Sequence, residues 1–169
     1  LSGDEGPLSL GVHNFTDPMP FYEFEDIPGV DDFLTGNHAN SYMRDGINTL
    51  YGEINGQKGF SITSLCKPAS SVASQLRNGL CSSEVLTSLG WGIPVSSQMA
   101  QIYMQLGLGV NIIVPHDCSY STAGLTKRDH PESCFFQQPY YRWNSEIYRS
   151  ANRSMQLLSR GRVDADVMV

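Results

Sequence analysis

The sequence of 169 residues lacks several features that would place it in a known class. No apolar run approaches the length needed to cross a bilayer, so we expect no transmembrane segment. The four histidines form no i, i+4 pair and there is no Gly-x-Ser-x-Gly motif, which argues against a helical zinc site and a serine-hydrolase elbow. The chain begins at Leu1 without a charged and then apolar leader, which is typical of a processed product. No cofactor is expected.

The cysteines lack the two-residue spacings of zinc and redox motifs. Their even number favours disulfides, and pairing of sequence neighbours is one of three connectivities. Each such bond would stabilise the fold by roughly 3 kcal/mol in the chain-entropy model. Two N-glycosylation sequons begin at Asn14 and Asn152. Together these features predict an extracellular or virion-surface glycoprotein with disulfides. The four predicted disulfide cysteines are Cys66, Cys81, Cys118 and Cys134.

Basic residues are missing from the first 43 positions, and acidic ones are concentrated there. The net charge of the whole chain is −6, which is a poor fit for a nucleic-acid partner. Residues 127–162 are instead rich in Lys and Arg. We therefore expect the acidic arm to meet the basic C-terminal region of the same or a neighbouring subunit, unless both are solvated surfaces. The basic residues are Lys127, Arg128, Arg142, Arg149, Arg153, Arg160 and Arg162.

The stretch from residue 60 to residue 115 has the clearest pattern. Residues 60–65 alternate apolar and polar side chains, which predicts a half-buried strand. Three short helices should follow. The first runs from Pro68 to a left-handed stop at Asn78-Gly79, and the others run from about 82 to 89 and from about 96 to 106. The β-branched residues 110–115 predict a buried strand.

Other segments carry weaker patterns. Residues 21–25 alternate and predict a short strand that Pro28-Gly29 breaks. Asn55-Gly56 suits a type I′ turn and predicts a hairpin that joins residues 50–54 to residues 57–65. The longest predicted helix begins at Asn144 or Ser145 and ends near 159. Its apolar face contains Ile147, Tyr148, Ala151, Met155 and Leu158.

These elements predict a single domain of the α/β or α+β class. Residues 1–49 form an acidic arm with loops, and residues 50–169 form the globular core. That core is expected to contain a small mixed sheet, three short central helices and a C-terminal amphipathic helix. The order strand, helices, strand favours a crossover that makes the two strands parallel neighbours, and an α+β packing without direct pairing is the alternative.

The sharpest catalytic hypothesis concerns a thiol. Cys81 precedes a predicted helix, whose N-terminus lowers a thiol pKa. His116, beside Asp117, is placed to act as a base. Gln75, Gly79 and Cys81 stand in the order Gln-x-x-x-Gly-x-Cys, which resembles the oxyanion glutamine and nucleophile of papain-type cysteine proteases. The resemblance covers about seven residues and implies a thiol hydrolase, whereas the cysteine parity implies that Cys81 belongs to a disulfide.

Two further sites are candidates. The aromatic segment from Tyr140 to Trp143 suits a small ligand or a carbohydrate. An acidic cluster has hard oxygen ligands for a cation such as calcium, although its spacing is not that of an EF-hand, and solvated acids are the alternative. The cluster consists of Glu23, Glu25, Asp26, Asp31 and Asp32.

The function predicted from these patterns is non-catalytic. We expect a secreted or virion-surface structural protein that associates with itself or with a protein partner through the acidic arm and the basic C-terminal helix. The first alternative is an extracellular thiol hydrolase that uses Cys81 and His116. The second alternative is a small-ligand or carbohydrate-binding module.

Overall fold

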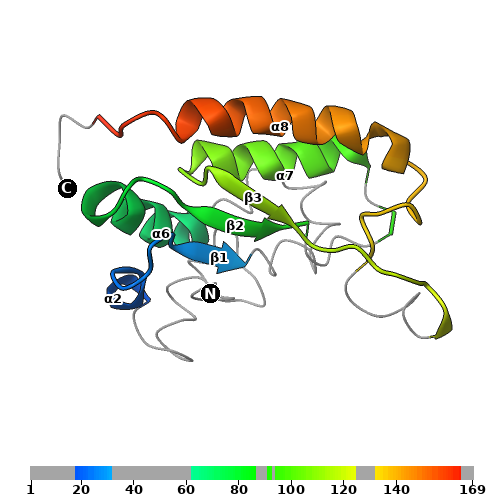
Figure 1. Cartoon of the computed structure of the whole chain (residues 1–169), viewed down its shortest axis with the longest axis horizontal. Helices are drawn as coiled ribbons and strands as arrows, with labels where there is room; N and C mark the ends of the chain where they lie inside the picture. Colours follow the sequence, from blue (N-terminus) through cyan, green and yellow to red (C-terminus); the bar gives the residue numbers. More distant parts are fainter. Residues whose placement is uncertain (1–17, 32–61, 87–90, 93, 125–131, 165–169) are drawn as a thin grey trace, which may run out of the picture.

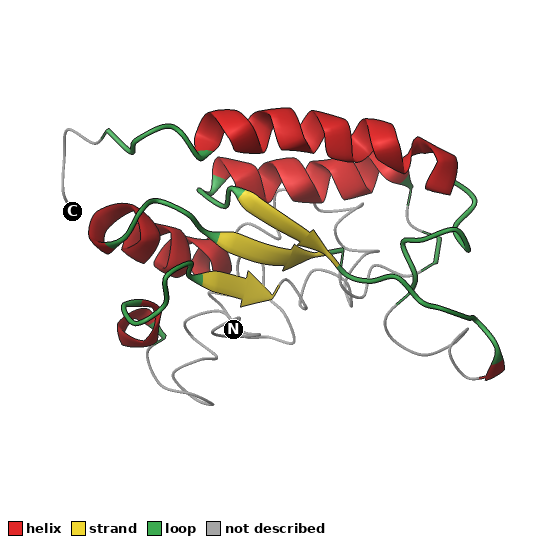
Figure 2. Ribbon diagram, in the orientation of Figure 1, coloured by secondary structure: helices red, strands yellow, loops and turns green. Residues whose placement is uncertain are grey.

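A computed structural model describes residues 18–31, 62–86, 91–92, 94–124 and 132–164. Within these ranges the chain forms three strands and four α-helices, with one short 3₁₀-helix (Figures 1 and 2). The predicted α/β class in a single domain is confirmed. None of the described helices is long and apolar enough to cross a membrane.

The described strands form a parallel sheet in the order β1, β2, β3. Strand β1 (Gly29–Asp31) pairs with β2 (Ser82–Val85), which pairs in turn with β3 (Ile112–Pro115). Helix α6 (Ile62–Leu76) lies in the sequence between β1 and β2, and α7 (Val95–Gly107) connects β2 to β3. The strands are parallel neighbours joined by helices, because parallel strands cannot be joined by a tight turn. The predicted crossover joined residues 60–65 to residues 110–115, whereas in the structure the strand that α7 connects to β3 is β2.

Two central predictions were wrong. Residues 62–65, which were predicted to end a strand, are the first turn of α6, so Pro68 lies inside this helix rather than at its start. Residues Ser82–Val85, which were predicted to begin a helix, form the central strand of the sheet. Val85 and Leu86 fit the apolar face of a helix as well as they fit a strand. In so short an apolar run, periodicity alone does not distinguish a helix from a strand.

The N-terminal predictions also change. Residues Met19–Tyr22 form a short helix, α2, where a strand at 21–25 was predicted, and Tyr22 is buried against α6. Gly29, which was predicted with Pro28 to interrupt a strand, instead begins strand β1. The predicted hairpin falls on residues 50–65, of which 50–61 lie outside the described residues. The described strands are all parallel, and nothing among them supports the mixed sheet.

The remaining helix predictions are confirmed. Gly79 has φ +81° and its N–H donates to the Ala73 carbonyl, which is the left-handed stop expected after α6. Helix α7 ends near Gly107. The 3₁₀-helix η2 (Tyr141–Trp143) leads into α8 (Asn144–Leu158), which buries Ile147 and Ala151 and packs beside α7 (Figure 1).

The helices cover one face of the sheet. Two apolar clusters fill the space between sheet and helices: one joins α2 and α6 to Val30, and the other joins α7 and α8 to Val85. Ile113 packs against both clusters. Successive residues within a strand point to opposite faces, so the strand residues next to these three, such as Asp31, Glu84 and Val114, face the other side. That side is less buried, and Val114 is 50% exposed although its strand was predicted to be buried.

Candidate functional site

Three chemically active residues lie at the carboxyl edge of the sheet, on the face opposite the described helices. Asp31 ends β1 and is the register partner of Glu84 on β2. Glu84 in turn pairs with Val114, and His116 follows two residues later along the same chain. Because side chains alternate along a strand, these three residues share one face. The carboxyl edge of a parallel sheet is where α/β proteins usually bind ligands.

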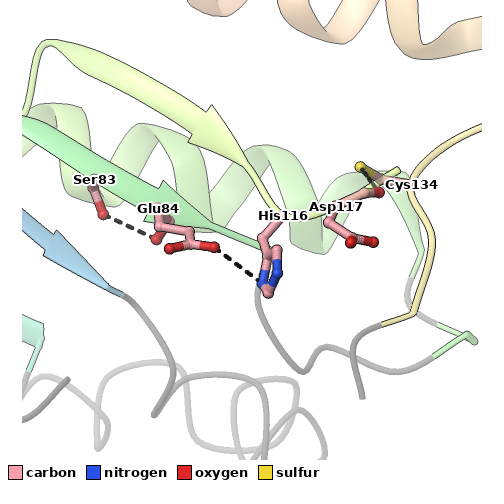
Figure 3. A network of polar contacts seen from close by, with 5 residues as sticks. All are labelled: Ser83, Glu84, His116, Asp117 and Cys134. Carbon is pink, nitrogen blue, oxygen red and sulfur yellow. Dashed lines mark hydrogen bonds and ion pairs between the residues drawn. The ribbon is translucent and has the colours of Figure 1, made fainter. Parts of the chain in front are cut away.

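Glu84 and His116 are in direct contact (Figure 3). Glu84 Oε1 lies 3.1 Å from His116 Nδ1, and the two side chains are 30% and 28% exposed. Hydrogen bonds to backbone carbonyl groups help to position both residues. The buried Ser83 hydroxyl donates to the Glu84 carbonyl, and the His116 N–H donates to the Val85 carbonyl. The pair is therefore fixed by two neighbouring strands, yet both side chains remain open to solvent and to a ligand.

Asp31 supplies a second carboxylate at this edge. Strands in a sheet are about 4.8 Å apart, so register partners place their side chains next to one another. Asp31 is buried, whereas Glu84 is half-buried. The two acids therefore occupy different environments on the same face. A pair of carboxyl groups with different surroundings can divide the roles of acid and base between them.

A cavity of about 530 Å³ lies between the end of β3 and the start of α8. Its walls include Pro115, the α8 residue Tyr148 and the aromatic rings of Phe135 and Tyr141. Side chains alternate along the strand, so Pro115 faces the helix side of the sheet, whereas His116 faces the other side. The rings of Phe135 and Tyr141 meet edge to face with centroids 5.1 Å apart. The guanidinium of Arg142, another wall residue, lies over the Trp143 ring. Part of the predicted aromatic segment therefore lines a cavity, and its aromatic and cationic groups suit a sugar.

The thiol hypothesis does not fit this geometry. Cys81 comes before strand β2 rather than before a helix, so no helix N-terminus lowers its pKa. It lies at the amino edge of the sheet, level with Asn111, while His116 lies beyond the carboxyl edge of β3, on the order of 15 Å further along the strand direction. Gln75 is exposed on α6. The structure therefore does not assemble Gln75, Cys81 and His116 into one site.

The environment of Cys81 is that of a core residue. Its side chain is 1% exposed, and its N–H donates to the buried Asn111 side chain, which donates in turn to the Gly79 carbonyl. Burial raises the pKa of the Cys81 thiol from 9.0 to about 12. A thiol of this kind is a poor nucleophile because it stays protonated.

This burial predicts a stability change at alkaline pH. The Cys81 pKa is higher in the folded chain than in the unfolded chain, so the protonated thiol stabilises the fold below pH 9 and this contribution is lost as pH rises from 9 towards 12. We expect the free energy of unfolding, measured with urea under reducing conditions, to fall in this range. Between pH 9 and 12, the free energy of unfolding of Cys81→Ala should fall less steeply with pH than that of the unsubstituted chain, by about 1.4 kcal/mol per pH unit. Equal slopes for the two proteins would refute the assignment.

The predicted disulfides are not formed. None of the four cysteines is in a disulfide, and no pair lies at disulfide distance. Cys66 and Cys81 both belong to the apolar cluster under α6, where they pack as small hydrophobic side chains. Cys118 and Cys134 line the cavity described above.

The acidic cluster does not form a cation site among the residues that can be described. No group of three or more His, Cys, Asp or Glu side chains there could hold a metal ion. Glu23 and Asp26 are exposed near α2, and burial raises the pKa of Glu25. Asp31 lies apart in β1, and Asp32 falls outside the described residues. These acids are close in sequence, but the described ones do not come together to coordinate a cation.

Several predictions are untouched by the structure. Asn14 and most of the acidic arm lie outside the described residues, whereas Asn152 is exposed on α8. Arg149 pairs with Glu146 on its own helix at 2.8 Å. Secretion, glycosylation, a virion location, self-association and the absence of a nucleic-acid partner all stay predictions. The division at residue 49 falls within 32–61, which is not described.

The signal that would have found Glu84 is weak in the sequence. His116 was identified as a base, and Asp31 was considered only as a cation ligand. Glu84 was assigned to a helix and received no role. The alternation in Ser82–Val85, with Ser82 and Glu84 at intermediate exposure and Ser83 and Val85 buried, becomes visible only when this segment is known to be a strand.

The parallel sheet, its helical crossovers and the polar carboxyl edge define a protein of the α/β class. No family model and no curated protein matches the sequence. Among solved structures, the chain is similar to a rhamnosidase from Novosphingobium sp. PP1Y, with a TM-score of 0.62 and 18% sequence identity. The match covers 87% of this chain but 13% of the rhamnosidase chain. At this identity the likeness shows a shared fold, in a protein much longer than this chain.

Proposed function

We propose that this chain hydrolyses glycosides and that residues at the carboxyl edge of its sheet supply the general acid and base. The observation that carries the proposal is the pair of Glu84 and His116, whose side-chain atoms are 3.1 Å apart at the carboxyl edge of the sheet. Both groups can exchange protons and both are partly exposed. Glu84 lies in strand β2, and His116 directly follows β3, where its N–H donates to the Val85 carbonyl. These are the properties that general acid/base catalysis requires.

Hydrolysis of a glycosidic bond ordinarily requires two carboxyl groups. One protonates the leaving oxygen, and the other activates water or attacks the sugar. We assign the proton-transfer role to Glu84, since its carboxyl group is the more accessible, and the second role to Asp31, its register partner on β1. His116 then positions the Glu84 carboxyl group through the contact at Nδ1.

The comparison with known structures supports the reaction class. The similar structure is named as a rhamnosidase, and a rhamnosidase cleaves a glycosidic bond. The cavity between the end of β3 and the start of α8 gives a second reason, because aromatic rings such as Phe135 and Tyr141 favour the apolar faces of sugars. We propose that this cavity binds sugar.

The protein that carries this chain should be assayed with a panel of 4-nitrophenyl glycosides that includes the α-L-rhamnoside. We expect nitrophenol release from at least one member of the panel, with a pH optimum set by proton-transferring groups. Absence of release from every glycoside across the acidic to neutral range would overturn the proposal. Tyr141→Ala offers a second measurement, because loss of a stacking ring should raise KM more than it lowers kcat.

A further inference from the structure

Two thiols of this chain lie together at the wall of the cavity. The Asp117 carbonyl accepts hydrogen bonds from both the backbone N–H and the Sγ of Cys134, each at 2.8 Å. The peptide unit of this carbonyl continues into Cys118. A single peptide unit spans about 3.8 Å, so a sulfur held on this oxygen is within reach of residue 118. Cys118 and Cys134 also line the same cavity.

The two cysteines differ in accessibility. Cys118 is exposed, whereas Cys134 is 9% exposed, and burial raises the pKa of the Cys134 thiol to about 11. Cys66 and Cys81 are more completely enclosed, at 0% and 1% exposure. A reagent in solution therefore meets Cys118 first, and the neighbouring thiol that could complete a reaction there is Cys134. Figure 3 shows Cys134 directed towards the backbone beside Asp117.

We propose that Cys118 and Cys134 form a thiol–disulfide exchange site whose oxidant is a low-molecular-mass disulfide such as oxidised glutathione. The Cys118 thiolate attacks one sulfur of that disulfide, forms a mixed disulfide and releases one thiolate. The Cys134 sulfur then loses its proton to solvent, attacks Sγ of Cys118 and expels the second thiolate. Two protein thiols are oxidised, one small disulfide is reduced to two thiols, and two protons leave the protein.

A disulfide between Cys118 and Cys134 would connect two segments that form walls of the cavity. Cys118 lies on the segment that leaves β3, directly after His116 and Asp117. Cys134 lies on the segment that leads into η2 and α8, where its carbonyl accepts a hydrogen bond from the Asn144 side chain. A disulfide would therefore tie the exit of the sheet to the start of the last helix. This inference concerns the thiols alone and does not depend on the proposed hydrolase activity.

The test is a thiol count on the whole chain. The protein is reduced, freed of reductant, incubated with oxidised glutathione, acid-quenched, denatured and alkylated, and its intact mass is then measured. We expect two thiols to be alkylated instead of four, and digestion should yield a cross-linked peptide that joins Cys118 to Cys134. Alkylation of all four thiols, or a stable glutathione adduct on Cys118 in the unsubstituted chain, would overturn the proposal.

Two single substitutions separate the steps. Cys134→Ser should trap the glutathione adduct on Cys118, since no second thiol can displace it, and Cys118→Ser should leave Cys134 unmodified. Oxidation should also raise the melting temperature of the unsubstituted chain by about 5–10 °C, because the bond restricts the unfolded chain. Neither serine variant should show this rise, and an equal rise in Cys118→Ser would contradict the assignment.

Discussion

Glu84→Gln is expected to lower kcat for glycoside hydrolysis by about 10²- to 10⁴-fold, with a much smaller change in KM. The amide has nearly the shape of the carboxyl group, so it should still lie beside His116 and bind the sugar. It cannot give or take a proton at the glycosidic oxygen. The loss therefore falls on the chemical step rather than on binding, and steady-state kinetics with the best aryl glycoside would measure it.

A matched control for this variant is Glu146→Gln. Glu146 is an exposed glutamate on α8, and its carboxylate pairs with Arg149 rather than with any residue of the carboxyl edge. A surface ion pair of this kind contributes about 0–1 kcal/mol, so the control should keep both its activity and its melting temperature. If Glu84→Gln retained kcat within threefold of the unsubstituted protein while the fold was intact, Glu84 would not be the proton donor.

The second large effect is on stability. Gly109→Ala should lower the free energy of unfolding by about 2–5 kcal/mol. Gly109 has φ +100°, which an alanine adopts only with strain, and an added Cβ would lie 2.9 Å from Ser70 Cβ and 3.0 Å from Ser70 Oγ. Ser70 is poorly placed to move away, because its hydroxyl donates to the Leu108 carbonyl at 2.8 Å. The substitution would therefore push α6 away from the turn that follows α7.

Gly107→Ala is the control for this prediction. Gly107 is the last residue of α7, no atom lies within 4 Å of its added Cβ, and its φ is not positive. Alanine there should be neutral or stabilise by up to about 1 kcal/mol, because it reduces the freedom of the unfolded chain. The free energies of unfolding of both variants can be measured with urea. Equal values would show that the close approach of Ser70 to Gly109 does not constrain the fold.

The elements that were predicted correctly are those whose signals are local. Helix α8 has a long apolar face, Gly79 has the left-handed conformation that Asn78-Gly79 indicated, and the β-branched run before Pro115 is a strand. In each case the periodicity or the turn chemistry of the segment favours one structure strongly, so its neighbours in space do not change the outcome. The α/β class followed from these elements and from their order.

The segments that were predicted wrongly are short and have no decisive period. Ser82–Val85 is a strand because it lies between β1 and β3, which satisfy its backbone hydrogen bonds on both sides. Residues 62–65 form the first turn of α6, whose buried stripe runs from Leu65 through Cys66, Ala69 and Val72. Such contacts come from residues distant in sequence, and they override a weak local preference.

The candidate site illustrates the same division. The residue types that could carry out chemistry are visible in the sequence: a histidine after a β-branched strand, acids near a Pro-Gly pair, and an aromatic segment before the last helix. Which of these groups meet depends on the fold. Parallel pairing aligns the ends of β1, β2 and β3, so Asp31, Glu84 and His116 come to one edge, while the same pairing leaves Cys81 at the opposite edge. Register between strands is a property of contacts across the sheet, and no single segment of the chain encodes it.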